Sequence, residues 1–222
     1  MIGVIGELLD SALGVAVSPV PLIALIVLLF STNPVAKSGM FTVGWMIGVA
    51  IPLVAAVAFD VGAASGSDER GGGPLSILLG LLMLFLAWKQ WSGRPKEGEP
   101  VEPPAWMAKV DQMSPLVAGG LGLFLAAVNA KNTPIDLAAG IQIAGANLSG
   151  AEATITILVY VILASVTMLV PVVASVVAAD TAASLLQRLQ DWLLANNNVI
   201  MTLLFGLLGL STLGEGLSSV FG

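Results

Sequence analysis

The chain has 222 residues, of which 57% are hydrophobic and 10% charged, and its mean hydropathy is +0.97. A soluble domain carries about 25% charged residues, so this composition places the chain, whose length fits one domain, in a bilayer. The sequence contains no cysteine and no histidine, which excludes thiolate chemistry, ordinary zinc sites and Ser-His or Cys-His nucleophile pairs. Its net charge of -6 does not fit a basic nucleic-acid footprint. We therefore expect a membrane protein with no metal, no cofactor and no nucleic-acid partner. We also expect it not to be an enzyme, since no apolar span carries the paired carboxylates that intramembrane acid-base chemistry would need.

Charge-free apolar runs predict six membrane-spanning helices, since a span needs about 20 apolar residues and a charge at its centre is costly. Asn33-Pro34 predicts a turn that makes the first two spans antiparallel. Residues 93–113 form a charged, Pro-rich loop that is too poor in apolar residues to fold as a domain. The six runs are residues 11–31, 38–59, 71–88, a fourth that starts near Ser114, 153–179 and 192–214.

Basic residues set the expected orientation. The first, third and fifth loops hold six Lys or Arg residues, whereas the opposite side holds only Arg70. The positive-inside rule then places these three loops in the cytoplasm and both termini outside a plasma (inner) membrane. Leucines recur at helical spacing over residues 181–195, which predicts an interfacial amphipathic helix or, equally, an extension of the sixth span into water.

The two halves of the chain show signs of an internal repeat. Ile77–Leu84 resembles Leu203–Leu210, and the second and fifth spans each contain one interior proline, Pro52 and Pro171. Three spans repeated once would make the copies face opposite ways, as in secondary transporters whose central site lies between inverted repeats. We predict a 3+3 inverted repeat with broken first and fourth helices. The predicted repeats are residues 1–92 and 114–222.

The first span contains Ser18, Pro19 and Pro21. A proline inside a helix removes a hydrogen bond, and lipid tolerates the unpaired group only where it faces protein or a wet cavity. We predict that these three residues line a substrate-binding cavity. A packing kink is the alternative.

The fourth span meets a polar segment with Asn129, Lys131, Asn132, Thr133 and Asp136. Ionisable residues at membrane depth indicate a functional site. We predict that Lys131 attracts an anionic headgroup, that the amides and the hydroxyl supply neutral hydrogen bonds, and that Asp136 pairs with Lys131 or carries a proton. Alternatively, Lys131 and Asp136 lie near a membrane face and extend to water.

Two further features of the first repeat have alternative interpretations. Asp10 precedes Ser18 by roughly two helical turns, so it is either an outer gate acid of a proton-coupled exporter or a solvated helix end. Gly44 and Gly48 form a small-xxx-small pattern that permits close helix contact, within one subunit or at a homodimer seam.

Several motifs occur in order along nearly the whole chain. They are Ser18-Pro19-Val20-Pro21, Gly44-Trp45, Pro104-Ala105-Trp106 through Asp111 to Ser114-Pro115, Gly120-Leu121-Gly122 and Asn129-Ala130-Lys131-Asn132. With these motifs the chain resembles the GAP family of the LysE exporter superfamily, actinobacterial proteins described as sulfolipid or peptidoglycolipid addressing proteins. One departure is Ala130, where the superfamily often has proline.

The resemblance implies a six-span plasma-membrane exporter of glycolipids or their precursors. A proton-driven secondary transporter is expected, because the sequence has no Gly-Lys-Ser/Thr loop for ATP. Two alternatives are an amino-acid-type exporter of small solutes and an accessory protein that positions a lipid-synthesis enzyme through the Pro-rich loop. A lipid cargo predicts an opening between helices toward the bilayer, whereas a small solute predicts a sealed cavity.

Overall fold

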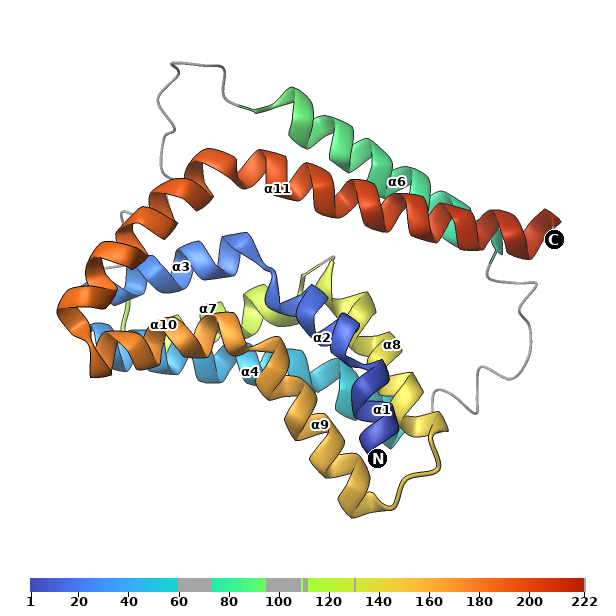
Figure 1. Cartoon of the computed structure of the whole chain (residues 1–222), viewed down its shortest axis with the longest axis horizontal. Coiled ribbons are helices and arrows are strands. Elements are labelled where there is room, and N and C mark those ends of the chain that lie inside the picture. The colour runs from blue at the N-terminus through green and yellow to red at the C-terminus, as the bar shows by residue number, and fades with distance from the viewer. Residues whose placement is uncertain (60–72, 95–108, 110–111, 130, 222) are drawn as a thin grey trace. The chain divides into compact units, whose positions relative to one another are not determined.

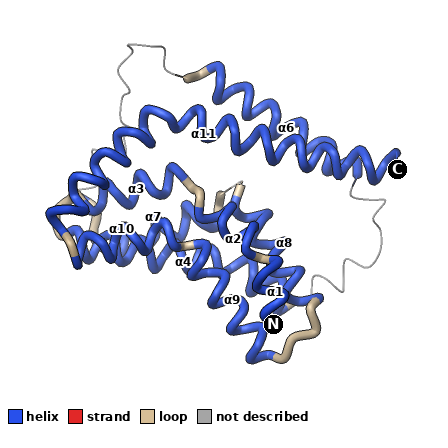
Figure 2. The backbone as a smooth tube through the Cα atoms, viewed as in Figure 1, coloured by secondary structure: helices blue, strands red, loops and turns tan. Residues whose placement is uncertain are grey.

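In a computed structural model of the chain, every regular element is a helix among the residues that the structure describes, which are 1–59, 73–94, 109, 112–129 and 131–221 (Figures 1 and 2). This finding confirms the predicted all-α class. Most of the predicted loop over residues 93–113, and Ala130, lie outside the described residues. The helices are α1 (Ile2–Glu7), α2 (Leu9–Ala16), α3 (Pro19–Leu29), α4 (Pro34–Ala58), α6 (Gly73–Ser92), α7 (Pro115–Ala127), α8 (Asn132–Gly145), α9 (Gly150–Ala164), α10 (Val166–Val177) and α11 (Ala179–Phe221).

Several of these helices have the length and composition of membrane spans. Among the described residues, α4 and the part of α11 between Ala182 and Ser218 are each long and apolar enough to cross a bilayer. The bent pairs α2–α3 and α9–α10 each meet the same test as one broken span, which gives up to four spans. The protein therefore has the character of a membrane protein. The six spans and the inverted repeat stay predictions.

The first two predicted spans differ in continuity. The first is divided into α2 and α3, which are bent by 54° relative to each other. The turn expected at Asn33-Pro34 is present, because Asn33 adopts a left-handed φ of 57° and Pro34 opens α4, where a proline sacrifices no helical hydrogen bond. α4 then continues without interruption through Pro52.

Small residues bring α4 and α7 into backbone contact. A Cβ atom on Gly44 would overlap the backbone carbonyl of Gly119, and one on Gly122 would overlap the backbone carbonyl of Phe41. Gly48 also lies against α7, with its Cβ position 2.8 Å from a backbone carbonyl oxygen. The small-xxx-small pattern of α4 therefore serves packing within the chain.

The fifth predicted span is not a single helix, and this break adds to the two that the sequence predicts in the first and fourth spans. It divides at Ser165 into α9 and α10, which are bent by 65°. The Ser165 carbonyl accepts hydrogen bonds from the N–H groups of both Met168 and Leu169 at 2.9 Å. Pro171 lies inside α10, and its missing N–H leaves the carbonyl of Thr167 without the usual helical donor. This lost bond weakens the helix just after the break.

The chain divides into two compact units. The first comprises Met1–Ala64 and Pro103–Gln190, and the second comprises Ser65–Glu102 and Asp191–Gly222. α11 begins in the first unit and continues in the second without interruption. The amphipathic segment predicted at 181–195 is thus continuous with the sixth predicted span, while its location at a membrane surface stays a prediction.

The second unit is a pair of helices, α6 and the later part of α11. The Cβ position of Gly80 lies 2.7 Å from the backbone nitrogen of Leu213. Toward the other end of α6, Asn198 donates to the carbonyl of Gln90 at 3.2 Å. These contacts show that α6 and α11 run antiparallel.

Candidate functional site

The break in the first predicted span consists of Val17 and Ser18. Ser18 has an extended backbone, with φ of -127° and ψ of 90°, because the ring of Pro19 disfavours helical geometry at the preceding residue. The Ser18 hydroxyl donates to the carbonyl of Val15 at 2.7 Å. Because the last carbonyls of a helix have no N–H partner within it, the break leaves backbone acceptors at the end of α2.

The break in the fourth predicted span is organised by the side chain of Asn129. Its Oδ1 atom accepts hydrogen bonds from the backbone N–H groups of Lys131, at 3.0 Å, and Asn132, at 3.2 Å. The hydroxyl of Thr133 donates to the carbonyl of Ala127, the last residue of α7, at 3.1 Å. These local bonds satisfy helix ends that would otherwise be unpaired, so the side chains of two predicted site residues, Asn129 and Thr133, shape the backbone of the break.

The two breaks contact each other. The Lys131 ammonium donates to the carbonyl of Gly14 at 2.7 Å and to the carbonyl of Val17 at 2.6 Å. The Asn132 Nδ2 atom donates to the Ser18 hydroxyl at 3.0 Å. The Lys131 side chain, just before α8, thus replaces missing helical donors at the end of α2, and Asn132 adds a side-chain bond between the two breaks.

The first and fourth predicted spans run antiparallel through this contact. At the far end of α8, Gln142 donates to the carboxylate of Glu7 at 2.8 Å, whereas the start of α8 lies at Ser18. The contact is also buried, since Lys131 is 4% exposed and Asn132 is fully buried. Lys131 is therefore packed against α2, whose C-terminal end carries negative partial charge, and does not extend to the protein surface as a snorkelling lysine does.

Asp136 occupies a separate position on α8. Its side chain is fully buried, and its Oδ1 atom accepts a hydrogen bond of 3.0 Å from the hydroxyl of Tyr160 on α9. Its Oδ2 atom is buried and, among the described residues, has no hydrogen-bond partner. Asp136 follows Lys131 by five positions, which directs the two side chains to different faces of a helix. In the described structure they form no direct ion pair.

The end of α2 also receives a donor from α10. The hydroxyl of Thr167 donates to the carbonyl of Ala16 at 2.7 Å. Sequence reasoning missed this contact and missed Tyr160. Tyr160 had a visible signal, since it is the one tyrosine of the chain and lies in a span without charged residues. Thr167 had no such signal.

The remaining predicted site residues lie around the contact without joining it. Pro19 and Pro21 are buried in the first turn of α3, where they fix the start of that helix. Asp10 is exposed in the first turn of α2 and takes no part in the hydrogen bonds described above. Among the described residues, no three His, Cys, Asp or Glu side chains come together as metal ligands.

The whole length of this arrangement can be compared with known protein families. The model of the family described as "Sap, sulfolipid-1-addressing protein" matches residues 8–218. The chain belongs to this family. The match confirms the resemblance to sulfolipid-addressing proteins drawn from the motifs. The family is described by lipid addressing and not by a reaction. No curated protein and no solved structure matches the chain.

Proposed function

We propose that this member of the sulfolipid-1-addressing family is a secondary transporter, which exports or flips a glycolipid or lipid precursor across the plasma membrane and is driven by protons. The family description supports lipid as the cargo. The observation that carries the proposal is the buried contact between two broken helices, in which Lys131 replaces helical hydrogen-bond donors. Interrupted helices that lie together within the membrane form the central site of many secondary transporters.

Lys131 is the proposed headgroup contact. An ammonium group has three N–H donors, and the carbonyls of Gly14 and Val17 take two of them. A sulfate or phosphate oxygen forms a stronger, charge-assisted bond than a neutral carbonyl does. An anionic headgroup would therefore engage the third donor and then compete with α2 for the other two.

This competition would couple binding to movement. The bonds from Lys131 and the bond between Asn132 and Ser18 join the end of α2 to the start of α8. When a headgroup draws Lys131 away, α2 loses these partners and can shift relative to α8. Asn129 and Thr133 would then act as positioning residues that hold the backbone around Lys131.

Asp136 is the proposed proton carrier. A buried carboxylate is stable only when hydrogen bonds or a nearby cation compensate its charge, and Asp136 has one hydrogen bond, from Tyr160, at one of its two oxygens. We therefore assign a proton to Asp136 in this conformation. Release of the proton would create an uncompensated buried charge between α8 and α9 and would favour a different arrangement of these two helices.

Transport in proteoliposomes tests the proposal. The cargo is a glycolipid extract of the native host, and an imposed proton gradient drives the reaction. We expect gradient-dependent movement that is lost in Lys131→Ala and in Asp136→Asn, while Lys89→Ala, a change at an exposed lysine of α6, leaves it intact. Circular dichroism confirms that each variant is folded.

Two outcomes would overturn the proposal. If both buried-site variants transport at the native rate, Lys131 and Asp136 serve structure alone. If the native protein moves no lipid but moves amino acids in the same vesicles, the protein is a small-solute exporter.

A further inference from the structure

A groove opens in the first unit between α3, α10 and the first turns of α11. Its volume is about 270 Å³. Leu22 of α3 forms one wall, and α11 contributes Leu189. The α10 wall consists of Val166, Thr167, Val170 and Pro171. We call this feature the chain groove.

The chemistry of the chain groove suits hydrocarbon. Its lining side chains are apolar apart from Thr167, and the hydroxyl of Thr167 is directed to the carbonyl of Ala16. Pockets for whole ligands commonly measure about 300–1,000 Å³, so this volume fits a single chain better than an entire lipid. Val170 is 59% exposed, which leaves the groove open along the outer side of α10.

The chain groove adjoins the buried Lys131 contact. Thr167 lines the groove and also bonds the Ala16 carbonyl, while the next carbonyl along the backbone, that of Val17, accepts from Lys131. Two consecutive carbonyls of one helix end thus connect an apolar groove to a buried cation. An amphiphile with an anionic headgroup and a hydrocarbon chain is complementary to this pair of neighbouring features.

We propose that the chain groove binds one acyl chain of an anionic lipid, entering laterally from the bilayer, while the headgroup of that lipid reaches Lys131. This inference rests on the proposed lipid transport and adds a location for the chain of the cargo. It also gives Thr167 a function, because Thr167 holds the groove wall of α10 against the end of α2. The lipid would then be recognised by its charge at one helix end and by its chain beside that end.

A matched pair of substitutions on α10 tests the chain groove. Val170 and Val173 have the same side chain and similar exposure, 59% and 57%, but only Val170 lines the groove. Tryptophan at Val170 would fill the groove, and tryptophan at Val173 would add the same bulk outside it. The probe is phosphatidylglycerol with a diazirine in one acyl chain, in nanodiscs. Phosphatidylcholine with the same labelled chain serves as the zwitterionic comparison.

Mass spectrometry then maps the photo-labelled residues. We expect the phosphatidylglycerol probe to label Leu22, Val166 and Leu189, and unlabelled phosphatidylglycerol to reduce this labelling by competition. The phosphatidylcholine probe should label these residues much less. Val170→Trp should lower this labelling about tenfold, which corresponds to about 1.4 kcal/mol of binding free energy, and Val173→Trp should leave it unchanged. Equal labelling in both variants, or labels spread evenly along exposed α10, would show ordinary surrounding lipid and overturn the inference.

The transport assay separates this inference from the proposed function. If Val170→Trp transports glycolipid at the native rate, the chain groove is not part of the pathway and lipid transport stands. If the native protein moves no lipid but the groove labels specifically for phosphatidylglycerol, the groove stands as a lipid site and the transporter proposal fails.

Discussion

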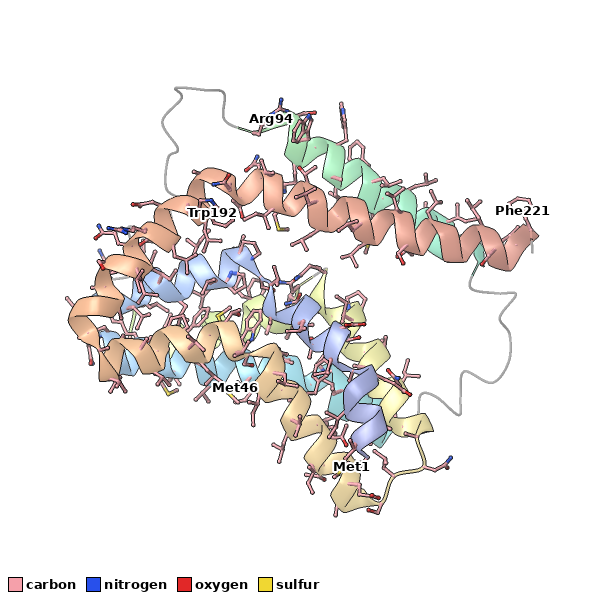
Figure 3. The ribbon with its side chains drawn as sticks, viewed as in Figure 1. Met1, Met46, Arg94, Trp192 and Phe221 are labelled. Carbon is pink, nitrogen blue, oxygen red and sulfur yellow. The ribbon has the colours of Figure 1, made fainter. Side chains whose placement is uncertain are left out.

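The two units of the molecule hold their helices together in different ways. In the first unit, broken helices meet through buried polar groups, with Lys131 on the carbonyls of Gly14 and Val17. In the second unit, α6 and the later part of α11 pack as an antiparallel pair through small residues, with Gly80 against the backbone of Leu213. Its described cations, Lys89 and Arg94, are exposed, and the guanidinium of Arg94 lies 3.8 Å from the centroid of the Trp91 ring. The side chain of Arg94 is labelled in Figure 3, at the end of α6.

The comparison shows where buried charge is tolerated. A continuous helix satisfies its own backbone, so a pair such as α6 and α11 needs only close packing in a membrane. A broken helix leaves backbone groups that require donors and acceptors from elsewhere. The buried Lys131 lies at such a break and supplies donors to it. We therefore expect substitutions at the breaks of the first unit to cost more stability than matched substitutions in the second unit.

The largest loss of stability should come from the glycine contact between α4 and α7. Gly122→Ala places a methyl group on the Phe41 carbonyl, and overpacking of this kind costs about 3 kcal/mol when the backbone must move. Gly120→Ala on the same helix meets nothing within 4 Å and should stabilise slightly, because alanine favours helix. SDS-induced unfolding in mixed micelles measures both free energies. A Gly122→Ala protein as stable as the Gly120→Ala protein would show that this backbone contact is not tight.

The second-largest effect should follow loss of the Lys131 ammonium. Lys131→Met keeps a long apolar side chain but leaves the Gly14 and Val17 carbonyls without their donor, which costs about 2 kcal/mol. Hydrogen exchange should rise in the residues around this break. The control is Lys89→Met at an exposed position of α6, for which we expect a change within about 0.5 kcal/mol. Unchanged exchange at the break in Lys131→Met would contradict the proposed bracing of α2.

The positions of these breaks could be predicted from sequence because their causes are local. Pro19 acts on the residue directly before it, and Asn129 accepts from the N–H groups of Lys131 and Asn132 close by in the sequence. The same reasoning located the turn at Asn33-Pro34. The break at Ser165 was missed, because one serine in an apolar run carries no charge and no adjacent proline.

The partners across the breaks could not be predicted, because they depend on tertiary packing. Lys131 bonds backbone carbonyls, which every residue possesses, so no residue type marks its partners. Asp136 finds Tyr160, 24 positions away on another helix. The sequence offered Lys131 as a partner for Asp136, but the helix between them turns the two side chains apart.

The hydrogen bond between Asn132 and Ser18, which joins the two breaks, should contribute more to stability than the bond between Asn198 and the Gln90 carbonyl in the second unit. Asn132 donates to Ser18 in a buried bond of 3.0 Å, and a cycle of Asn132→Leu, Ser18→Ala and the double variant should give a coupling energy of about 1 kcal/mol. Asn198, which donates to the Gln90 carbonyl, should lose about 0.5 kcal/mol as Asn198→Leu. Additive free energies in the Asn132 and Ser18 cycle would show that the breaks are held together by other contacts.

The smallest predicted difference compares two threonines. Thr167 donates across helices to the Ala16 carbonyl at the end of α2, at 2.7 Å. Thr202 donates at 2.7 Å to the Asn198 carbonyl of its own helix and reaches the Ala87 carbonyl of α6 only at 3.4 Å. A change to valine exchanges the hydroxyl of either threonine for a methyl group and so removes the hydrogen bond. The Ala16 carbonyl lies at a helix end, where its backbone donor is the Ser18 N–H at 2.9 Å and not an N–H four residues on, so Thr167→Val should cost about 1 kcal/mol.

Thr202→Val should cost less, within about 0.5 kcal/mol, because the Asn198 carbonyl keeps its helical N–H partner and valine retains the shape of threonine. SDS titrations of the two variants in one lipid mixture resolve the difference. The order of the two values is the decisive result. If Thr202→Val is the more damaging change, polar bonding at the end of α2 does not distinguish the first unit, and the stability of its breaks must come from the apolar packing around them.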